Sequence, residues 1–436
     1  MRILLAVHHF PPRYSAGAEL YTMRLAHELL RRGDECEVVC VETLDMKQPF
    51  GVQAERDDYH NIPVWRLHLG LRDAPVDWSY ANSTITAWFE QRIQVFQPDI
   101  VHLQSGYLIG VGAINAAHAQ DIPAVVTLHD YWFLCPRITL LRGDGTLCKQ
   151  PPLDPAECAW CLQLNQRRYR LPEQLSAGLA GKAWITLTGE RGRTAQQVRR
   201  DTLRAALAQA DLVISPSHFL AGLFREWVPH VQVIRIGITQ EHLRQVQPVR
   251  SGQRLRIGYI GQIVPHKGVH LLITAFKSLP SSNCPAELII FGNPDQNPAY
   301  TNHLRRLIGD DPGIQIAGKF RHDQLADVLS RVDVIVVPSI WYENSPLTIL
   351  EAHAAGRPVI CSRLGGMVEL VRNEVDGLLF TPNDDRDLAR QLRRLHTEPG
   401  LLERLRDGIQ PPRTFADELE ELLQHYTTLS KRHATV

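Results

Sequence analysis

The chain has 436 residues, of which 44% are hydrophobic and 22% are charged, and its 47 basic residues balance 47 acidic ones. This composition is typical of a globular protein of two or three domains and excludes a disordered or collagen-like chain. The balanced charge argues against a nucleic-acid partner, because phosphate backbones favour a basic excess. No apolar run approaches the roughly 18 residues of a membrane span, and eight cysteines are too few for a disulfide scaffold. We therefore expect a cytoplasmic protein.

The first half of the chain alternates strand-like and helix-like patterns. The short apolar run Ile3–Val7 leads directly into two histidines and two prolines, so it predicts a strand rather than a secretory signal. Apolar residues recur at helical spacing over Glu19–Arg32, and Gly33 follows as a stop signal. Several of the strand-like runs are apolar throughout, which is typical of parallel strands buried on both faces. Further strands are predicted at Glu37–Val41, Asp99–Leu103, Ala124–Leu128, Leu212–Ser215 and Val231–Ile234.

A second alternating series follows the polar stretch Gln245–Arg254. Its predicted strands are Arg256–Ile260, Glu287–Phe291, Ile314–Ala317, Val334–Val337 and Pro358–Cys361. Its predicted helices are Val269–Leu279, Asp323–Arg331, Pro346–Ala355 and Asp385–His396. Two such series predict an α/β protein with two Rossmann-like, doubly wound domains. Ligands of such sheets bind at the carboxyl ends of the strands, so we expect the site in a cleft between the domains.

The domain boundaries follow from this alternation. We expect an N-terminal domain over 1–248, which carries an insert at about 133–205, and a C-terminal domain over 249–412. A last helix over 413–436 presents apolar residues on one face and is expected to pack back on the N-terminal domain, with the C-terminal domain as the alternative.

The segment from Glu343 to Glu351 is the first candidate site. It follows the strand Val334–Val337, and Ser345 is a good N-cap with Pro346 at the first helical position. A helix start at the end of a buried strand is an anion site. Eight residues at helical rise separate the two carboxylates by roughly 12 Å, about the reach from ribose to sugar in a nucleotide diphosphate-sugar. The alternative is two unrelated surface glutamates.

Three further βα connections carry weaker signals. Lys267 lies where the strand Arg256–Ile260 leads into a helix, so it can place a point charge on a phosphate, although the Walker spacing is absent. In the turn that begins at Ser15, Gly17 would let the backbone approach a ligand. His129 ends the strand Ala124–Leu128 and could bind a sugar hydroxyl or stabilise developing charge. A plain turn, a solvated lysine and a structural histidine are the alternatives.

Taken in order, these segments resemble the family-4 glycosyltransferases of the GT-B fold. The resemblance is strongest where "IGYIGQIVPHKG", "VIVVPSIWYENSPLTILEAHAAGRPVI" and "GLLF" follow one another, and weaker at "ILLAVHHFPPRYSAGAELYTMRLAHELLRRG", "PDIVHLQS" and "TLHDYW". It implies two Rossmann-like domains, a nucleotide diphosphate-sugar donor, transfer with retention of anomeric configuration and catalysis without a metal ion. The implied acceptor is a glycan, a lipid-linked saccharide or a polysaccharide precursor.

The resemblance also implies roles for individual residues. Glu343 would contact the donor sugar and Glu351 the ribose, while Lys267 would bind the diphosphate and stabilise it as it leaves. Gly17 would admit the diphosphate, and His129 would line the sugar pocket. The remaining donor-binding positions implied by the motif are Gln262, Asn344, Ser345, Pro346, Leu347 and Thr348.

Two positions depart from the family pattern. Gln262 stands where an arginine usually lies beside the phosphate, so Arg363 or Arg321 would have to compensate, and Ala16 replaces the first of a usual glycine pair. The loss of a fixed charge keeps a catalytically inactive binding subunit as an alternative. A GT-B nucleotide-sugar epimerase is the alternative within enzymes.

Four cysteines cluster directly after His129: Cys135, Cys148, Cys158 and Cys161. In a cytoplasmic protein such a cluster favours a structural metal over disulfides, and four thiolates suit zinc. Free thiols, a redox pair and an iron–sulfur cluster are the alternatives. We expect no cofactor for catalysis itself.

The segment after the cysteines is basic, with nine Lys or Arg and three acidic residues between Leu164 and Arg204. Leu171, Leu175 and Leu179 recur there at helical spacing. Such a face could contact an anionic membrane and would suit a lipid-linked acceptor. The alternative is a solvated helix whose leucines belong to the core.

Overall fold

The computed structural model describes all residues except 15, 245, 247–253, 280–284 and 435–436, and no side chains at 432–434. Ser15, most of the polar stretch predicted at 245–254 and the boundary predicted at 248/249 therefore lie outside the described residues. The contacts divide the chain into two units. The first unit comprises Met1–Pro216, Leu220–Ile234 and Leu419–Val436, and the second comprises Ser217–Phe219 and Arg235–Glu418.

The first unit is built on an eight-stranded sheet with the order β3-β4-β2-β1-β5-β6-β7-β8. All neighbouring strands are parallel except β3 and β4, which pair antiparallel at one edge. The side chains of β5 and β6 are buried along their whole length, as the apolar runs predicted. The strands are β1 Arg2–Val7, β2 Glu35–Pro49, β3 Gly51–Tyr59, β4 Ile62–Arg72, β5 Ile100–Leu103, β6 Ala124–Thr127, β7 Leu212–Ser215 and β8 Val231–Val233.

The edge formed by β3 and β4 was not predicted from the sequence. The middle of β3, residues 53–56, is exposed, and its acidic and basic side chains give no apolar alternation. Its partner β4 has a mixed pattern of buried and half-buried side chains. Strand β2 also runs on to Pro49 as an exposed ribbon, eight residues beyond its predicted end. Pairing across the sheet edge, rather than local hydrophobicity, therefore accounts for β3 and for the extension of β2. Strand β4 buries Ile62, Val64, Leu67, Leu69 and Leu71, a signal that the sequence analysis missed.

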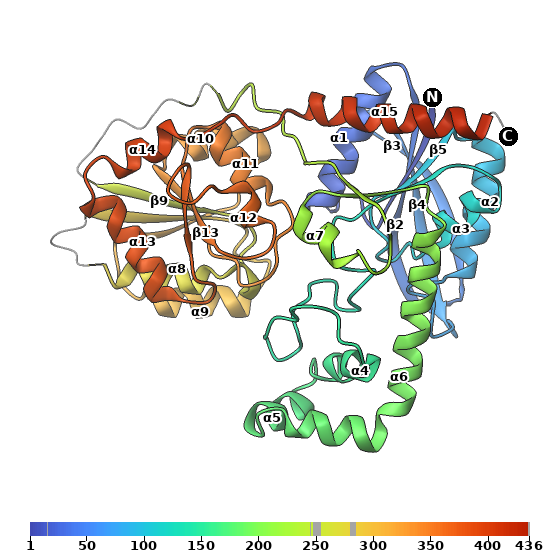
Figure 1. The fold of residues 1–436 in the computed structure, drawn as a ribbon, viewed down its shortest axis with the longest axis horizontal. Helices are drawn as coiled ribbons and strands as arrows, with labels where there is room; N and C mark the ends of the chain where they lie inside the picture. Colours follow the sequence, from blue (N-terminus) through green and yellow to red (C-terminus); the bar gives the residue numbers. More distant parts are fainter. Residues whose placement is uncertain (15, 245, 247–253, 280–284, 435–436) are drawn as a thin grey trace. The chain divides into compact units, whose positions relative to one another are not determined.

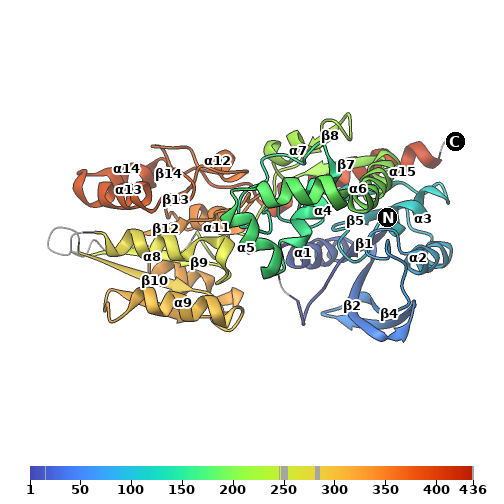
Figure 2. The same cartoon turned by 90° about the horizontal axis from the view of Figure 1, so that it is seen from below.

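Among the described residues, the helices before β9 are α1 Gly17–Arg31, α2 Ser83–Phe96, α3 Gly112–His118, α4 Pro155–Gln163, α5 Arg167–Leu175, α6 Leu179–Ala208 and α7 His218–Leu223. In the first unit, α4 packs along the long helix α6 and α5 lies at its N-terminal end (Figures 1 and 2). Ala177 and Gly178 have positive φ and separate α5 from α6. The leucines predicted as one helical face at 171–179 thus belong to two helices. Among the described residues, no helix combines the length and the hydropathy needed to cross a bilayer.

The second unit is built on a six-stranded, wholly parallel sheet with the order β11-β10-β9-β12-β13-β14. Its strands are β9 Leu255–Ile260, β10 Ala286–Phe291, β11 Ile314–Gly318, β12 Val334–Val337, β13 Val359–Ser362 and β14 Gly377–Phe380. Its helices are α8 Val269–Lys277, α9 Pro298–Ile308, α10 Leu325–Ser330, α11 Leu347–Ala354, α12 Met367–Leu370, α13 Asp385–Thr397 and α14 Leu401–Asp407, with short 3₁₀ turns η1 Pro265–Lys267 and η2 His322–Gln324.

Helices cover both faces of this sheet. One core cluster joins alternate strand residues to α8, α9, α13 and α14, and the other joins the opposite residues to α10, α11 and α12. Ile290 and Ile289 illustrate the alternation, since they lie next to each other on β10 but belong to different clusters. The doubly wound arrangement is thereby confirmed.

The last helix, α15 Phe415–Ala434, carries the chain back to the first unit, to which it belongs from Leu419 onward. Tyr426 is fully buried there, and its hydroxyl hydrogen-bonds Nδ1 of His102 on β5. Nε2 of His102 in turn contacts Oγ1 of Thr127 on β6 at 2.7 Å. The helix is therefore tied into the core of the first unit.

Candidate functional site

In the second unit, the strands that precede the predicted site residues are neighbours in the sheet. Strands β9, β12 and β13 lie side by side and are parallel, so their carboxyl ends meet at one edge. The amide of Ile340, after β12, donates to the carbonyl of His266, after β9, at 2.9 Å. The amide of Gly366, after β13, donates to the carbonyl of Glu343 at 2.7 Å. Three loops are thus joined into one rigid surface.

Lys267 and Glu343 meet on this surface. Nζ of Lys267 lies 2.7 Å from Oε1 of Glu343. The same oxygen accepts a hydrogen bond from Oγ of Ser339 at 2.7 Å and from Nε1 of Trp341 at 2.8 Å. Nζ of Lys267 also lies 5.3 Å from the centre of the Trp341 ring, within cation–π range. The sequence predicted Lys267 and Glu343 as separate sites, and the structure brings them together.

The charges of this cluster are balanced at neutral pH. Burial alone would raise the pKa of Glu343, but the charge and hydrogen bond of Lys267, with those from Ser339 and Trp341, lower it overall. Glu343 is therefore an ionised carboxylate although it is only 7% exposed. Burial and the neighbouring Lys267 lower the pKa of His266 to about 4, so His266 is neutral. The surface thus holds one fixed cation, one fixed anion and a neutral imidazole.

Two glycine positions allow the loops to approach this closely. Gly268 has φ +71°, and a Cβ there would lie 1.9 Å from the carbonyl oxygen of Pro338. A Cβ on Gly366 would lie 1.8 Å from the carbonyl oxygen of Asn344. Neither position can carry a side chain without moving the backbone beside Glu343. Gly366, Ser339 and Trp341 were not singled out from the sequence. The sequence does show a polar residue and a Trp shortly after the strand Val334–Val337, and two consecutive glycines after the next strand.

The helix start predicted at Ser345 and Pro346 is corrected by one residue. Pro346 is the N-cap of α11, with φ −64° and ψ 115°, and no side chain caps the helix. Ser345 is therefore not the N-cap. The amide of Ile349 already bonds the Pro346 carbonyl, so the first amides of the helix belong to Leu347 and Thr348.

The spacing of the two glutamates changes with that correction. Only Leu347–Glu351 follows the helix, whereas the segment from Glu343 to Pro346 does not. The separation of roughly 12 Å expected from eight helical steps therefore does not apply. Glu351 and Asn344 are half-buried, and Oγ1 of Thr348 lies 3.5 Å from the carbonyl oxygen of Ile260 at the end of β9.

Gln262, which replaces the arginine usual in the family, and the two arginines that could compensate for it make none of the contacts described for Lys267 and Glu343. Gln262 is exposed, and its backbone carbonyl accepts a hydrogen bond from the hydroxyl of Tyr259 at 2.6 Å. The exposed Arg321 pairs with Asp323. Arg363 is exposed directly after β13, so it lies on the strand end beside the site.

His129 belongs to a second polar cluster, in the first unit. It follows β6, and its Nε2 lies 2.8 Å from Oε1 of Gln104, which follows the neighbouring strand β5. Its ring lies 4.9 Å from that of Tyr21 on α1. Burial, and then the nearby His8, lowers the pKa of His129 to about 4, so the ring is neutral at pH 7. Gly17 is the first residue of α1; it is exposed, and a Cβ there would meet nothing within 4 Å.

Two members of this cluster were missed as site residues. Nε2 of His8, directly after β1, lies 3.2 Å from Oε1 of the buried Glu19 in the first turn of α1. Nδ1 of His8 and Oε2 of Glu19 are buried with no partner among the described atoms. Unsatisfied buried polar atoms at a strand end are a feature of ligand sites. The sequence does place His8 directly after a buried strand, and the same kind of position was the reason for predicting His129.

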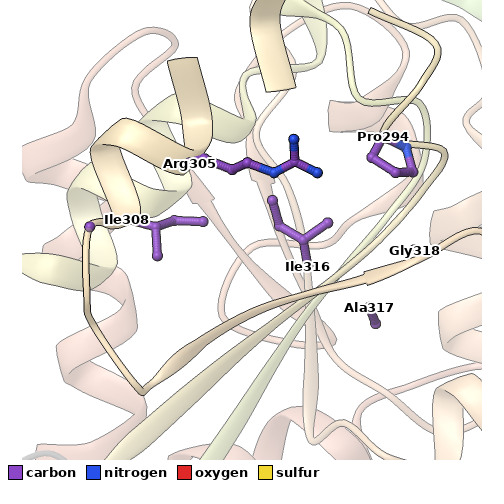
Figure 3. Close-up of a pocket in the computed structure, with 7 residues that line it drawn as sticks. Pro294, Arg305, Ile308, Ile316, Ala317 and Gly318 are labelled. Carbon is purple, nitrogen blue, oxygen red and sulfur yellow. The ribbon is translucent and has the colours of Figure 1, made fainter. Parts of the chain in front are cut away.

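The four cysteines line one small cavity in the segment between β6 and α6. Within the described part of the chain, no three His, Cys, Asp or Glu side chains are already placed as the ligands of a metal ion. A larger, open pocket of about 350 Å³ lies in the second unit where α9 meets the edge strand β11 (Figure 3). It is lined by Pro294, Arg305, Ile308, Gly309, Ile316, Ala317 and Gly318, none of which was predicted as a site residue.

Two family models match the chain. The one described as "Glycosyltransferase Family 4" matches residues 15–242, and the one described as "Glycosyl transferases group 1" matches residues 240–410. The chain is 32% identical over 407 residues to an uncharacterized glycosyltransferase of Methanocaldococcus jannaschii, covering 92% of this chain and 91% of the relative. It is 27% identical over 444 residues to a D-inositol 3-phosphate glycosyltransferase of Stackebrandtia nassauensis, covering 96% of this chain and 88% of the relative.

Solved structures share the fold. Anabaena HepE in complex with UDP-glucose superposes with a TM-score of 0.66 at 17% identity, covering 98% of this chain and 100% of that one. The sucrose-phosphate synthase of Thermosynechococcus elongatus gives a TM-score of 0.64 at 19% identity, with 98% of each chain covered. The predicted architecture of two Rossmann-like units in the GT-B arrangement of elements is confirmed.

Proposed function

The chain belongs to glycosyltransferase family 4, and from this premise we propose that it moves a sugar from a nucleotide diphosphate-sugar with retention of configuration and without a catalytic metal ion. The observation that carries the proposal is the Lys267–Glu343 pair at the carboxyl ends of β9 and β12. Ligands of doubly wound sheets bind at this edge.

Lys267 supplies the fixed positive charge for the diphosphate. An ammonium has three N–H donors, and Glu343 accepts one of them. The others remain for phosphate oxygens, which gain charge as the glycosidic bond breaks. The first amides of α11, at Leu347 and Thr348, add donors from the positive end of a helix. Donors held in place before the reaction stabilise the leaving group without reorganising, so a metal ion is not required in this role.

Glu343 supplies the polar contact for the donor sugar. The hydrogen bonds described for its side chain all reach Oε1, and we assign Oε2 the role of accepting a sugar hydroxyl. Its carboxylate also places negative charge where the sugar becomes positive as the leaving group departs. Support for retention comes from the order of the family's motifs in this chain, since the family-4 resemblance implies a retaining transfer.

The remaining residues take roles that follow from their positions. Glu351, on the second turn of α11, binds the ribose hydroxyls, and Asn344, Ser345 and Pro346 complete the donor loop. Gln262 contacts the phosphate by hydrogen bonding rather than by charge.

In the first unit, His129 is proposed to bind a sugar hydroxyl. It is neutral, so its ring has one donor and one acceptor nitrogen. Gly17, exposed at the start of α1, leaves the helix amides open to an anionic group. These roles are proposed on the first unit by itself.

The acceptor is proposed to be a glycan or a lipid-linked saccharide at an anionic membrane surface. Leu175, Leu179 and Leu187 are 87%, 65% and 81% exposed. Leu175 and Leu179 are therefore not core residues, whereas a solvated helix stays the alternative to a membrane contact. Basic side chains accompany them along α5 and α6. Exposed apolar residues among basic ones bind anionic lipid surfaces.

A nucleotide panel tests the donor site first. The full chain is heated with UDP, GDP, dTDP or ADP, and a ligand at a hundred times its dissociation constant should add roughly 2.7 kcal/mol of stability. The nucleotide that binds identifies the donor sugars to be tried. Proton NMR of the product then reports the anomer, and a chelator should leave the rate unchanged. An inverted product or loss of rate with the chelator would contradict the proposed mechanism, and an epimerised sugar without transfer would favour the epimerase.

Flotation tests the membrane contact. Vesicles with anionic lipid should carry the protein upward, and a Leu175→Ser, Leu179→Ser variant should stay behind. Val76→Ser removes an apolar residue that is 96% exposed in a different part of the first unit, so it is the matched control. Equal flotation of all three proteins would refute the contact.

A further inference from the structure

Four cysteine side chains converge on one cavity in the first unit. The cavity has a volume of about 20 Å³, and its walls include Cys135, Cys148, Cys158 and Cys161. A space of this size holds about one water-sized atom. Cysteines that are up to 26 positions apart in the chain are thereby gathered around room for a single ion.

The local structure explains how the four residues come together. Cys158 and Cys161 lie three residues apart on α4, so they share one face of the helix. Cys148 follows a hairpin in which Leu141 and Leu147 pair antiparallel, and its amide bonds the carbonyl of Leu140 at 2.8 Å. Cys135 closes the turn in which its amide donates to the carbonyl of Tyr131, at 2.7 Å.

The hairpin and α4 are pressed against each other. A Cβ on Gly143, in the hairpin, would lie 2.7 Å from the carbonyl oxygen of Cys161 and 2.5 Å from Cβ of Leu164. Only glycine permits this approach. The helix is held in turn by α6, since Arg193 pairs with Asp154, the N-cap of α4, at 3.0 Å. The backbones of the hairpin and of α4 are therefore held next to each other by contacts that need no ion.

The charges around the cavity suit an anionic centre. Arg137 and Arg142 line it together with one carboxylate, Glu157, which lies 3.8 Å from Arg142. Four thiolates around a divalent cation carry a net charge of −2. The two guanidiniums and the Glu157 carboxylate together contribute +1 beside the cavity, which partly offsets that charge.

We propose that Cys135, Cys148, Cys158 and Cys161 are the four ligands of one structural zinc ion. Zinc prefers four thiolates in a tetrahedron at about 2.3 Å. The four thiols line one cavity but are not placed in that geometry among the described residues, so binding requires their side chains to turn toward its centre. Cys148 then exchanges its hydrogen bond to the carbonyl of Gln150 for the metal. The ion joins the hairpin, α4 and the end of the loop after His129 into one unit, independently of the function proposed above.

Metal analysis of the full chain tests this inference. Protein purified without an affinity tag, with zinc present during expression and excess zinc then removed, should contain one equivalent of zinc. Cobalt added in its place should give the intense charge-transfer absorption of a tetrahedral thiolate site. Less than a tenth of an equivalent of zinc, iron in its place, or disulfides among these cysteines by mass spectrometry would overturn the assignment.

Variants separate these cysteines from the others. Cys158→Ala with Cys161→Ala should reduce the bound zinc at least tenfold, whereas Cys36→Ala, at a cysteine that is 2% exposed on β2, should leave one equivalent. Retention of zinc by the double variant would overturn the assignment. In the wild-type chain, a chelator should speed protease cleavage between residues 135 and 165 at least tenfold and leave nucleotide binding by the second unit unchanged. Unchanged cleavage would refute the structural role.

Discussion

Replacing Lys267 with methionine removes the charge of the ion pair and keeps a side chain of similar length. The paired side chains of Lys267 and Glu343 are only 22% and 9% exposed. Breaking a buried pair by removing one partner costs about 3–5 kcal/mol, because the other charge stays buried. Ser339 and Trp341 still donate to the carboxylate, so we expect the second unit to lose about 2 kcal/mol.

The same change should weaken nucleotide binding. A hydrogen bond to a charged group contributes about 1.5–3 kcal/mol, which corresponds to a loss of roughly 10- to 100-fold in affinity for the diphosphate. Titration calorimetry with the tightest of UDP, GDP, dTDP and ADP measures this loss, and urea unfolding measures the stability. Lys319→Met is the control, since Lys319 is an exposed lysine directly after β11.

The dependence of stability on acid pH separates the contribution of the ion pair to folding from its contribution to nucleotide binding. Because the pKa of Glu343 is lowered from its ordinary value of 4.5 in the folded chain, the stabilisation by the pair is present above pH 4.5 and is lost as the pH falls through the folded pKa. In Lys267→Met this part of the acid dependence should disappear. A folded variant that binds every nucleotide as tightly as the wild type would refute the donor role, and an unchanged stability would refute the account of the pair.

Three further outcomes are expected. Glu351→Gln should weaken nucleotide binding about tenfold by calorimetry and leave the urea midpoint unchanged; equal affinity removes the ribose contact. Gly366→Ala should destabilise the second unit by about 1–3 kcal/mol in urea because its Cβ would clash with Asn344, whereas Gly222→Ala, where a Cβ meets nothing within 4 Å, should change stability by less than about 1 kcal/mol. Burial lowers the pKa of His102 to about 3, so between pH 7 and pH 5 only the unfolded chain takes up its proton; over this range the wild type should lose about 2 kcal/mol more stability than His102→Gln, in which the other buried histidines still contribute. An equal loss in the two proteins, measured by urea unfolding at both pH values, would show that His102 is not buried as described.

The second unit was the more predictable part of the fold. Its strands are short apolar runs buried on both faces, so hydrophobicity alone locates them, as at Val334–Val337. Helix α9 was missed because it is amphipathic and rich in polar residues, and it begins with the cap of Asn297 and Pro298 rather than with an apolar run. The short strand β14 was quoted only as a motif, because four residues give too little pattern.

The sequence allowed individual residues of the candidate site to be predicted, but not which of them contact one another. Lys267 and Glu343 each follow a buried strand, which is a property that the sequence displays. Their pairing depends on β9 and β12 being neighbours, although 76 positions separate the two residues. Strand order is decided by packing of the whole sheet, which local patterns do not encode. The same reason hid the contact of His8 with Glu19 in the first unit.

The return of α15 to the first unit has a consequence for how the polypeptide is made. The first unit includes the chain from Leu419 onward, yet every residue of the second unit precedes Leu419 and is synthesised before it. The second unit can thus fold before the first unit is complete, because Tyr426, which contacts His102, is synthesised after it. A chain that stopped after residue 418 should fold its second unit, whereas its first unit would lack α15 and would be exposed to proteolysis.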